Sequence, residues 1–388
     1  MKKVFAIMLA AIMVMAMFAG CGSSAETAQA GTIKIGMTGP LTGDAAVYGT
    51  AVEAGIEIAV EEINAKAEAE GGLKIEFKSE DDEADGEKAV SGYNVLKDWG
   101  MQVFIGTVTS AACNAVAPEA VNDQIFLLTP SASDPEVAYA GSNTFQMCFT
   151  DPNQGAAAAE IIAANWAGAS IGLIYDSSDN YSSGLYEGFM AKAGELGLNV
   201  VCETSFTKDT KSDLTTQVTQ CKDTGADLMF LPIYYTEASQ ILTYANKIGY
   251  EPTFVGCDGM DGLLDVDGFD TALAEGLVLI TPFDANASDD ATVSFVNKFV
   301  EKTGGVPNQF AADAYDCVYA VYNACVAAGI TGSEDAATIC AALVEWFTTT
   351  NEGFNGLTGS GMTWDENGMI SKTPITVVIE NGVYVPLA

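Results

Sequence analysis

Residues 33–43 read IKIGMTGPLTG, and residues 48–65 read YGTAVEAGIEIAVEEINA. The first stretch is a short apolar run that ends in a turn rich in glycine and proline, a pattern typical of a β-strand and the loop after it. In the second stretch, from Val52 to Ile63, apolar residues recur at the spacing of one helix face, while glutamates occupy the other face. The two stretches therefore predict a strand that leads directly into a helix.

The same unit recurs along the chain. Further strand-like runs lie at residues 75–78, 103–106, 125–128, 171–175, 200–203, 228–231, 253–256 and 277–281. Helical patterns lie at residues 86–99, 112–122, 154–167, 184–196, 212–223, 237–248, 291–302 and 309–328. The alternation restarts after Asp151-Pro152, and residues 363–368 and 375–379 are typical of hairpins. Alternating strands and helices imply right-handed crossovers, so we predict an α/β fold with two doubly wound parallel-sheet lobes. In such folds ligands bind at the carboxyl ends of the strands.

The charge of the chain restricts its function. The 388 residues include 52 acidic and 16 basic ones, all of the basic ones lysine, and the net charge is −36 at pH 7. There is no arginine and no histidine. A protein with so negative an electrostatic field repels nucleic acids and anionic surfaces, so we expect it to bind neither. The lack of histidine excludes catalytic triads and zinc sites that depend on histidine. The sequence also has no dinucleotide-binding, P-loop or GxSxG motif. We therefore expect no enzymatic activity, no cofactor and no metal, and a ligand that is neutral, zwitterionic or cationic overall.

One acidic run imitates a metal site. Residues 81–87 read DDEADGE, like the start of a calcium-binding loop, but the twelfth position is Gly92, where such a loop needs a glutamate. An acidic helix start fits this run better, because acidic side chains are stabilised at the positive end of the helix dipole.

The N-terminus has the pattern of an export signal. Lys2 and Lys3 precede an apolar run, residues 4–18, that is too short to cross a bilayer easily, and small residues then lead to Cys21. This arrangement resembles the lipobox of bacterial lipoproteins. We expect residues 1–20 to be a signal peptide, Cys21 to be lipidated, and residues 21–31 to form a flexible tether at the outer face of the membrane. An ordinary secretory signal with an incidental cysteine is the alternative. No other run is long enough for a transmembrane helix.

Eight cysteines remain after Cys21, and none of them forms a C-x-x-C pair. Several lie inside apolar runs, which favours small buried hydrophobic residues over a metal or redox site. An exported chain can hold one or two disulfides, but spacing alone does not choose among the pairings.

Hydroxyl side chains follow two neighbouring strands of the predicted first lobe. Residues 106–112 read GTVTSAA and residues 129–135 read TPSASDP, which places Ser110, Ser131 and Ser133 where a strand leads into a helix. The free N–H groups of a helix N-terminus attract anions, so the two loops can hold a carboxylate without an arginine. Each loop alone is more typical of an N-cap. Two such loops on consecutive strands favour a binding site.

The predicted second lobe offers the opposite charge. Tyr181 and Tyr234 each follow a strand, and Asp258 follows another, in FVGCDGMDG. A carboxylate can pair with an ammonium group and aromatic faces attract cations, although an aspartate beside glycine is also a common turn residue. Together with the hydroxyl loops, these residues predict a divided site. One lobe would bind a carboxylate and the other an ammonium, which is the complement of an amino acid zwitterion.

The sequence resembles the branched-chain amino acid binding proteins of ABC transporters, which have the type I periplasmic binding protein fold. The resemblance extends from Thr32 to the C-terminus. It is carried by the segments IKIGMTGPLTGDAAVYG, DDEADGEKAVSGYNVL, FIGTVTSAA, LLTPSASDPEV, FTDPNQG, LIYDSSDNYSSG and FVGCDGMDG.

The resemblance implies roles for individual residues. Ser110 and Ser133, with the backbone around Ser131, would hold the carboxylate of the ligand and help to hold its ammonium. Asp258 would pair with the ammonium. The pocket for the ligand's side chain would be formed by Tyr48, Val108, Thr109, Tyr181, Tyr234 and Phe310. Two positions depart from the family pattern, because Ser133 replaces the more usual threonine and Asp258 is one methylene shorter than the glutamate of some members.

The resemblance also implies three crossovers between the lobes, near Thr150, Thr281 and Ser371. Lobe I would comprise residues 31–150 and 282–371, and lobe II residues 151–281 and 372–388. We expect a monomeric, extracytoplasmic lipoprotein that captures a branched-chain or other hydrophobic L-amino acid by hinge closure. It would deliver this amino acid to the permease and ATPase subunits of an ABC importer. Two alternatives share the fold, namely the binding of an amide, urea or aromatic acid, and ligand sensing by a receptor domain.

Overall fold

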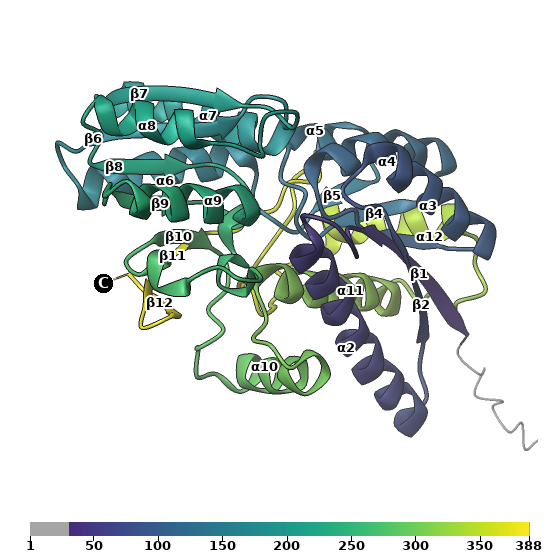
Figure 1. The fold of residues 1–388 in the computed structure, drawn as a ribbon. Helices are drawn as coiled ribbons and strands as arrows, with labels where there is room; N and C mark the ends of the chain where they lie inside the picture. The colour runs from purple at the N-terminus through teal and green to yellow at the C-terminus, as the bar shows by residue number, and fades with distance from the viewer. Residues whose placement is uncertain (1–30, 388) are drawn as a thin grey trace, which may run out of the picture.

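The computed structural model describes residues 31–387 and divides them between two α/β lobes that lie side by side (Figure 1). The predicted signal peptide, Cys21 and all but the last residue of the predicted tether lie outside the described residues. Within residues 31–387, no helix combines the length and the apolar character that a membrane span requires.

Lobe I is built on a parallel sheet with the strand order β2-β1-β3-β4-β5. The strands are β1 (Thr32–Gly39), β2 (Lys74–Asp81), β3 (Val103–Ile105), β4 (Phe126–Thr129) and β5 (Thr144–Gln146). The helices from the same part of the chain are α2 (Ala46–Glu70), α3 (Gly86–Trp99), α4 (Ser110–Asp123) and α5 (Pro135–Tyr139). Later in the chain follow α10 (Asp290–Thr303), α11 (Gln309–Ala327), α12 (Ala336–Glu345) and a π-helical turn (Trp346–Thr350), and Figure 1 shows these helices with lobe I or beneath it.

Lobe II is built on a second sheet with the order β12-β11-β10-β9-β8-β6-β7. Its strands are β6 (Ser170–Asp176), β7 (Asn199–Phe206), β8 (Leu228–Leu231), β9 (Thr253–Gly256), β10 (Val278–Thr281), β11 (Ile375–Glu380) and β12 (Val383–Pro386). Its helices are α6 (Asp151–Asn165), α7 (Asn180–Leu196), α8 (Thr215–Asp223) and α9 (Tyr235–Lys247), with 3₁₀ turns at Asp258–Met260, Leu263–Asp265 and Thr271–Ala274. Strands β6 to β10 pair in parallel, whereas β11 and β12 form an antiparallel hairpin at one edge. The predicted fold class, two doubly wound lobes, is confirmed.

The described chain passes from one sheet to the other lobe at three places: between β5 and α6, between β10 and α10, and before β11. The third connection is fixed to lobe I by a buried lysine. The ammonium of Lys372 forms an ion pair with Asp313 of α11 and donates to Thr358 Oγ1 over 2.7 Å, and the side chains of Lys372 and Asp313 are 0% and 1% exposed. The third connection is thus anchored to lobe I by a buried ion pair and a hydrogen bond.

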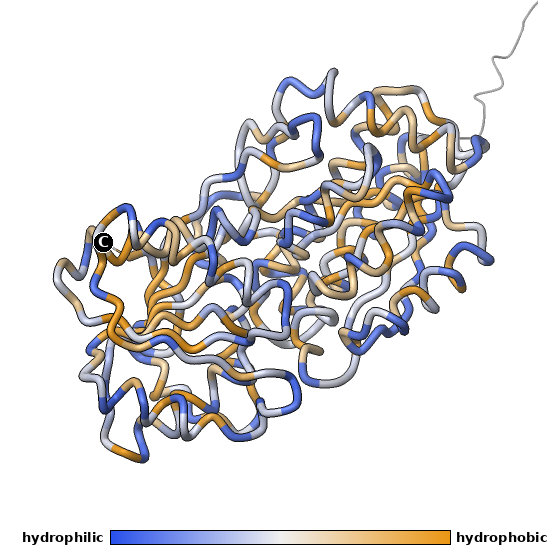
Figure 2. Tube along the Cα trace, turned by 90° about the horizontal axis from the view of Figure 1, so that it is seen from above, coloured by the Kyte–Doolittle hydropathy of each residue, from blue (hydrophilic) through white to orange (hydrophobic). Residues whose placement is uncertain are grey.

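The apolar strands form the interior of each lobe. All four residues of β8, LMFL, are buried, as expected of a parallel strand covered by helices on both faces. In Figure 2 the strands on the side of the C-terminus form an orange band within lobe II, and blue segments lie in the loops around it. In lobe I, α2 and α11 approach so closely that a Cβ atom at Gly55 would lie 2.2 Å from the carbonyl oxygen of Ala311. Only glycine permits this contact.

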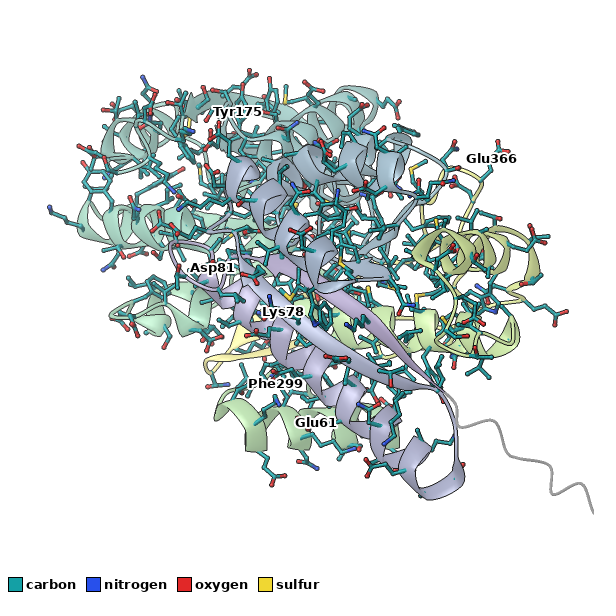
Figure 3. All side chains as sticks on the ribbon, turned by 90° about the vertical axis from the view of Figure 1, so that its right-hand side faces the viewer. Glu61, Lys78, Asp81, Tyr175, Phe299 and Glu366 are labelled. Carbon is teal, nitrogen blue, oxygen red and sulfur yellow. A yellow bond between two sulfur atoms is a disulfide. The ribbon has the colours of Figure 1, made fainter. Side chains whose placement is uncertain are left out.

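Helix α10 is attached to α2 from outside the sheet. Phe299 of α10 is buried in an apolar cluster with residues of α2, and Lys302 forms ion pairs with Glu57 over 2.9 Å and with Glu61 over 2.8 Å. Figure 3 shows Phe299 and Glu61 where these helices meet. Such exposed ion pairs each contribute at most about 1 kcal/mol, so the apolar contact is the main attachment.

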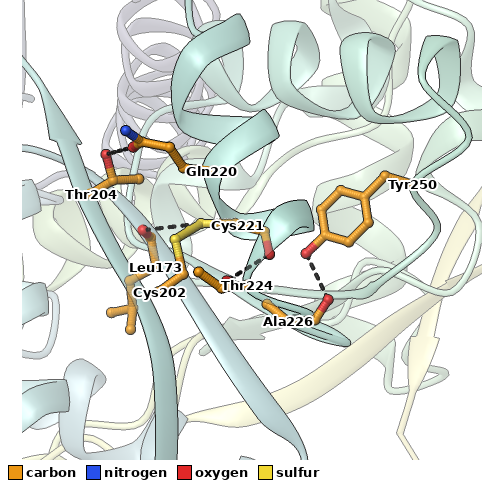
Figure 4. Close-up of a disulfide and its surroundings, with 8 residues drawn as sticks. All are labelled: Leu173, Cys202, Thr204, Gln220, Cys221, Thr224, Ala226 and Tyr250. Atoms are coloured by element: carbon orange, nitrogen blue, oxygen red, sulfur yellow. Dashed lines mark hydrogen bonds between the residues drawn. A yellow bond between two sulfur atoms is a disulfide. The ribbon is translucent and has the colours of Figure 1, made fainter.

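One pair of cysteines is bonded. Cys202 of β7 and Cys221 of α8 form a disulfide with their Cα atoms 5.2 Å apart (Figure 4). The disulfide closes a loop between two residues that are 19 positions apart in the sequence. In the chain-entropy account, closing such a loop stabilises a fold by about 3 kcal/mol. The other cysteines of the described chain are free and buried, in keeping with small hydrophobic residues: Cys113, Cys148, Cys257, Cys317, Cys325 and Cys340.

The acidic run at residues 81–87 forms a helix start. Asp85 is the N-cap of α3, and its carboxylate accepts from the N–H groups of Glu87 and Lys88 over 2.9 and 3.1 Å. The described residues contain no cluster of three metal-ligating side chains.

Candidate functional site

A small cavity of about 20 Å³ lies between the lobes, at the carboxyl ends of their strands. Its walls come from the loops and first helical turns that follow β1, β3 and β4 in lobe I and β6, β8 and β9 in lobe II, and from the start of α11. The lining residues are Tyr48, Val108, Thr109, Ser110, Ser131, Tyr181, Tyr234, Asp258, Gly259 and Phe310. All the candidate binding residues predicted from the sequence except Ser133 therefore lie on this wall.

The lobe I wall contains the N-terminus of α4. The N-cap residue Thr109 makes no side-chain capping hydrogen bond, and its Oγ1 has no hydrogen-bond partner among residues 31–387. Thr109 is 5% and Ser110 1% exposed. The first N–H groups of a helix need acceptors, and here they start at the cavity with no side chain to cap them. This end of α4 is suited to an anion such as a carboxylate.

Ser110 can add a hydrogen bond to the same anion. Its Oγ accepts from the N–H groups of Ser133 and Asp134, each over 3.2 Å. A serine hydroxyl is also a donor, and these two contacts leave its proton available. The backbone of the next loop thus orients Ser110 toward the cavity.

The remaining two serines differ in position. Ser131 lines the cavity, but its hydroxyl donates to the carbonyl oxygen of Val108 over 2.8 Å, so this side chain mainly joins the two loops. Ser133 is fully buried behind the wall, and its Oγ has no hydrogen-bond partner within the described chain. Its position relative to Ser110 is set by the backbone hydrogen bond described above.

The lobe II wall contains a buried carboxylate. Asp258 is 2% exposed. Its Oδ1 accepts from Tyr181 Oη over 2.7 Å and from the N–H of Gly259 over 2.8 Å, and its Oδ2 accepts from Gln154 Nε2 over 2.9 Å. Burial raises the pKa of Asp258 to about 6, while the hydrogen bonds from Tyr181, Gln154 and Gly259 act in the opposite direction. A cationic group in the cavity would favour the ionised carboxylate.

Aromatic rings cover the rest of the cavity. Tyr181 and Tyr234 of lobe II are stacked with their ring centroids 4.9 Å apart. Tyr48 of lobe I packs at 5.6 Å from Tyr234 and edge-on at 4.8 Å from Phe310. The hydroxyl of Tyr48 donates to the carbonyl oxygen of Gly259 and so joins the two lobes directly. The walls between the two polar ends are therefore apolar faces that suit a small hydrophobic group.

The lobes also touch at the rim of the cavity. Lys211 of lobe II forms an ion pair with Asp44 of lobe I over 3.0 Å and with Glu237 of its own lobe over 3.1 Å. Asn180 Nδ2 donates to Asp134 Oδ2 over 3.1 Å, again between lobes. An outer groove of about 620 Å³ runs along this rim and shares Tyr234 with the inner cavity. The structure is thus a closed arrangement of the two lobes.

Two residues of the site were not among the sequence predictions. Gly259 lines the cavity, and Gln154 holds Asp258 through its side-chain amide and also accepts from the Asp258 N–H over 3.3 Å. Gln154 is fully buried in the first turn of α6. Its segment, FTDPNQG, carried part of the resemblance and is the sequence signal that points to it.

Comparison with known proteins identifies the family of this chain. A family model described as periplasmic binding protein matches residues 32–382. The chain belongs to the periplasmic binding protein family. Among its relatives in this family is the leucine-, isoleucine-, valine-, threonine- and alanine-binding protein of Pseudomonas aeruginosa, which is 26% identical over 357 residues that cover 92% of each chain.

Solved structures of periplasmic binding proteins share the architecture. The branched-chain amino acid transporter substrate binding protein LivJ from Streptococcus pneumoniae, in complex with isoleucine, has a TM-score of 0.81 and 26% identity over 92% of this chain and all of that one. A solute binding protein of an ABC transporter from R. palustris, in complex with benzoate, has a TM-score of 0.80 over 92% of this chain and 96% of that one. At 18% identity, the latter likeness concerns the fold alone. The predicted resemblance and the type I fold are confirmed, and membership of this family implies an extracytoplasmic solute-binding protein of an ABC transporter.

Proposed function

We propose that this periplasmic binding protein captures a branched-chain or other hydrophobic L-amino acid between its lobes and delivers it to the permease and ATPase of an ABC importer. One observation carries the proposal: a buried, uncapped helix N-terminus with Ser110 and a buried carboxylate, Asp258, bound the same small cavity from opposite lobes. The α-carboxylate would lie at α4 and the α-ammonium at Asp258. The relatives named for branched-chain amino acids support the proposed substrate class.

The aromatic wall favours an apolar side chain. The rings of Tyr48, Tyr181, Tyr234 and Phe310 offer no charged partner, and burying one methylene group on them contributes about 0.8 kcal/mol. Because the ligand would touch both lobes, it would stabilise the closed arrangement and so control docking on the permease. We further propose that Cys21 carries the lipid that keeps the monomeric protein at the outer face of the membrane.

An aromatic carboxylate is the second candidate. Its carboxylate would bind at α4 as before, and its ring would stack in the aromatic wall without an ammonium for Asp258. The hydrogen bonds that Asp258 receives from Tyr181, Gln154 and Gly259 favour this reading, because they satisfy the carboxylate within the protein.

Calorimetric titration of the purified protein separates the two candidates. The ligands are L-leucine, L-isoleucine, L-valine, L-phenylalanine, D-leucine, isocaproate (leucine without its amino group), benzoate and urea. We expect a hydrophobic L-amino acid to bind with a micromolar or lower Kd, about −8 kcal/mol or better, and its D-form and isocaproate to bind far more weakly. Heat from benzoate or urea, with none from any α-amino acid, would refute the proposed substrate class.

The affinity for the amino acid should fall at acidic pH. Above about pH 6 Asp258 is ionised and available to the ammonium, whereas below this pH a proton competes with the ligand for the carboxylate. The Kd for L-leucine should therefore rise by up to about tenfold for each pH unit below 6. Titrations between pH 5 and 7.5 test this, with Asp258→Ala as the control in which the dependence flattens. A Kd that stays constant over this range would contradict the pairing of Asp258 with the ammonium.

A further inference from the structure

A buried carboxylate outside the cavity joins the two lobes. Asp261 directly follows the 3₁₀ turn Asp258–Met260 of lobe II and is 6% exposed. Its Oδ2 accepts from the backbone N–H of Gln309 over 2.8 Å and from Gln309 Nε2 over 3.3 Å. Gln309 is buried and is the first residue of α11, which packs on α2 in lobe I. Asp261 and Gln309 therefore form a buried hydrogen-bonded pair between the lobes.

This pair lies next to both walls of the cavity. Asp258 and Gly259, on the same loop as Asp261, line the cavity from lobe II, and Phe310, the residue after Gln309, lines it from lobe I. Gln309 Nε2 also lies 3.5 Å from the carbonyl oxygen of Asp258. Neither member of the pair lines the cavity itself. Any effect of the pair on a ligand must therefore come from the positions of the two walls.

The loop that carries Asp261 contacts lobe I at two further points. The carbonyl oxygen of Gly259 accepts a hydrogen bond from Tyr48. Gly262 has a φ of +114°, and a Cβ atom there would lie 2.8 Å from Val47 Cγ1 of α2. In the closed arrangement the loop is thus packed directly on lobe I.

The N-terminus of α11 suits an acceptor such as Asp261. The first N–H groups of a helix have no partner within the helix, and the helix dipole attracts negative charge. The N-cap Asn308 binds the N–H of Ala311, while the N–H of Gln309 binds Asp261. Burial raises the pKa of Asp261 to about 7, and the hydrogen bonds from Gln309 act in the opposite direction. The neutral acid can carry its proton on Oδ1, so Oδ2 accepts from Gln309 in either state.

We propose that Asp261 is a positioning residue that binds the N-terminus of α11 only when the lobes close and thereby stabilises the closed arrangement around the ligand. In a protein that is mostly open without ligand, a contact made only in the closed form lowers the Kd of every ligand by the same factor. Asp261 thus contributes to affinity, whereas Asp258 contributes to the choice of ligand. This inference rests on the proposed function, because it requires capture by closure of the two lobes.

Hydrogen exchange tests whether the contact depends on closure. The probe is the backbone amide of Gln309, measured by mass spectrometry of peptides that contain it, because this N–H donates to Asp261. In wild type we expect saturating L-leucine to slow the exchange of this amide at least tenfold. In Asp261→Ala the same ligand should slow it less than threefold. Equal protection with and without ligand in wild type would mean a permanent contact and would overturn the inference.

Calorimetry and stopped-flow fluorescence test the contribution to affinity. Asp261→Ala should raise the Kd for L-leucine at least fivefold, mainly through faster dissociation, and should raise the Kd for any other bound compound of the titration panel by the same factor. Asp261→Asn keeps an oxygen that can accept from Gln309, and its amide would face a small cavity of about 20 Å³ that Asp261 and Tyr384 line. This conservative variant should therefore restore the Kd to within twofold of wild type.

Asp265→Ala is the matched control. Asp265 lies four residues further along the same segment, is exposed, and does not line the cavity. Its replacement should leave both the Kd for L-leucine and the exchange of the Gln309 amide within twofold of wild type. Thermal unfolding of each ligand-free variant accompanies these measurements. The exchange measurement on wild type needs no variant, so it decides the question even if Asp261→Ala does not fold.

The outcomes separate the inference from the proposed function. If wild type binds benzoate but no α-amino acid, the proposed substrate class is wrong, and the same measurements with benzoate decide the role of Asp261. If wild type binds nothing in the panel, both fail. If wild type binds L-leucine and Asp261→Ala binds it equally well, the inference alone fails. It also fails if Asp261→Asn loses as much affinity as Asp261→Ala, because the acceptor oxygen would then not be what matters.

Discussion

Replacement of Asp258 by alanine should raise the Kd for L-leucine by roughly 30- to 5,000-fold, which corresponds to a loss of about 2–5 kcal/mol. The carboxylate is 2% exposed, so a ligand ammonium that loses it stays in a cavity without water to replace it. The cost also includes Tyr181 and Gln154, which lose the acceptor for their hydrogen bonds. Calorimetric titration measures the change directly.

Isocaproate provides the control for this variant. It has the carboxylate and the branched chain of leucine but no ammonium, so its Kd should change only a few-fold in Asp258→Ala. The complementary variant is Ser110→Ala. It should raise the Kd for both ligands, because both present a carboxylate to α4. If Asp258→Ala weakens L-leucine and isocaproate by the same factor, Asp258 does not bind the ammonium.

Replacement of Lys372 by methionine should lower the free energy of unfolding by about 3–5 kcal/mol, the usual cost of leaving one member of a buried ion pair alone. Lys372 is the partner that holds the Asp313 carboxylate in an interior where burial raises its pKa to about 7. Without the lysine, Asp313 must either remain charged and unpaired or take up a proton. Urea unfolding at pH 7.5 measures the loss.

Two further variants identify the cause. Adding Asp313→Asn to Lys372→Met removes the unpaired charge and should restore most of the stability. Lys302→Met removes an exposed lysine that forms ion pairs with two glutamates. It should lower the free energy of unfolding by less than about 1 kcal/mol. If the Lys372→Met protein is as stable as Lys302→Met, the buried ion pair contributes nothing to the stability of the fold.

Periodic patterns sufficed to predict most of the fold. The strands β8 and β9 were predicted with the bounds that the structure has, because short apolar runs between polar loops are distinct in the sequence. Strand β5, TFQ, and helix α12, AATICAALVE, were not predicted. A strand of three residues has too few positions to show alternation, and a helix with apolar residues on most sides lacks a polar face.

The cavity wall was predictable to a similar degree, for a topological reason. Ser110 and Asp258 follow strands, and the carboxyl ends of parallel strands converge at one edge. Gln154 was not assigned, because it lies on a helix after a crossover and meets the wall only through tertiary packing. The position of Ser133 behind the wall depends on the rotation of a single turn, which no spacing rule determines.

The lysine at the rim, Lys211, has a consequence for the energetics of capture. Both lobes carry more carboxylates than lysines, and oxygen-tipped side chains project around the whole outline in Figure 3. Two acidic bodies repel each other as they approach, and dissolved salt shortens the range of this repulsion to about 10 Å at 0.1 M. In the proposed closure, the two lobes therefore approach each other against the protein's own field, and Lys211 is a counterion at the rim where they meet. We therefore expect the salinity of the surroundings, together with the supply of solute, to set the fraction of molecules in which the lobes are closed.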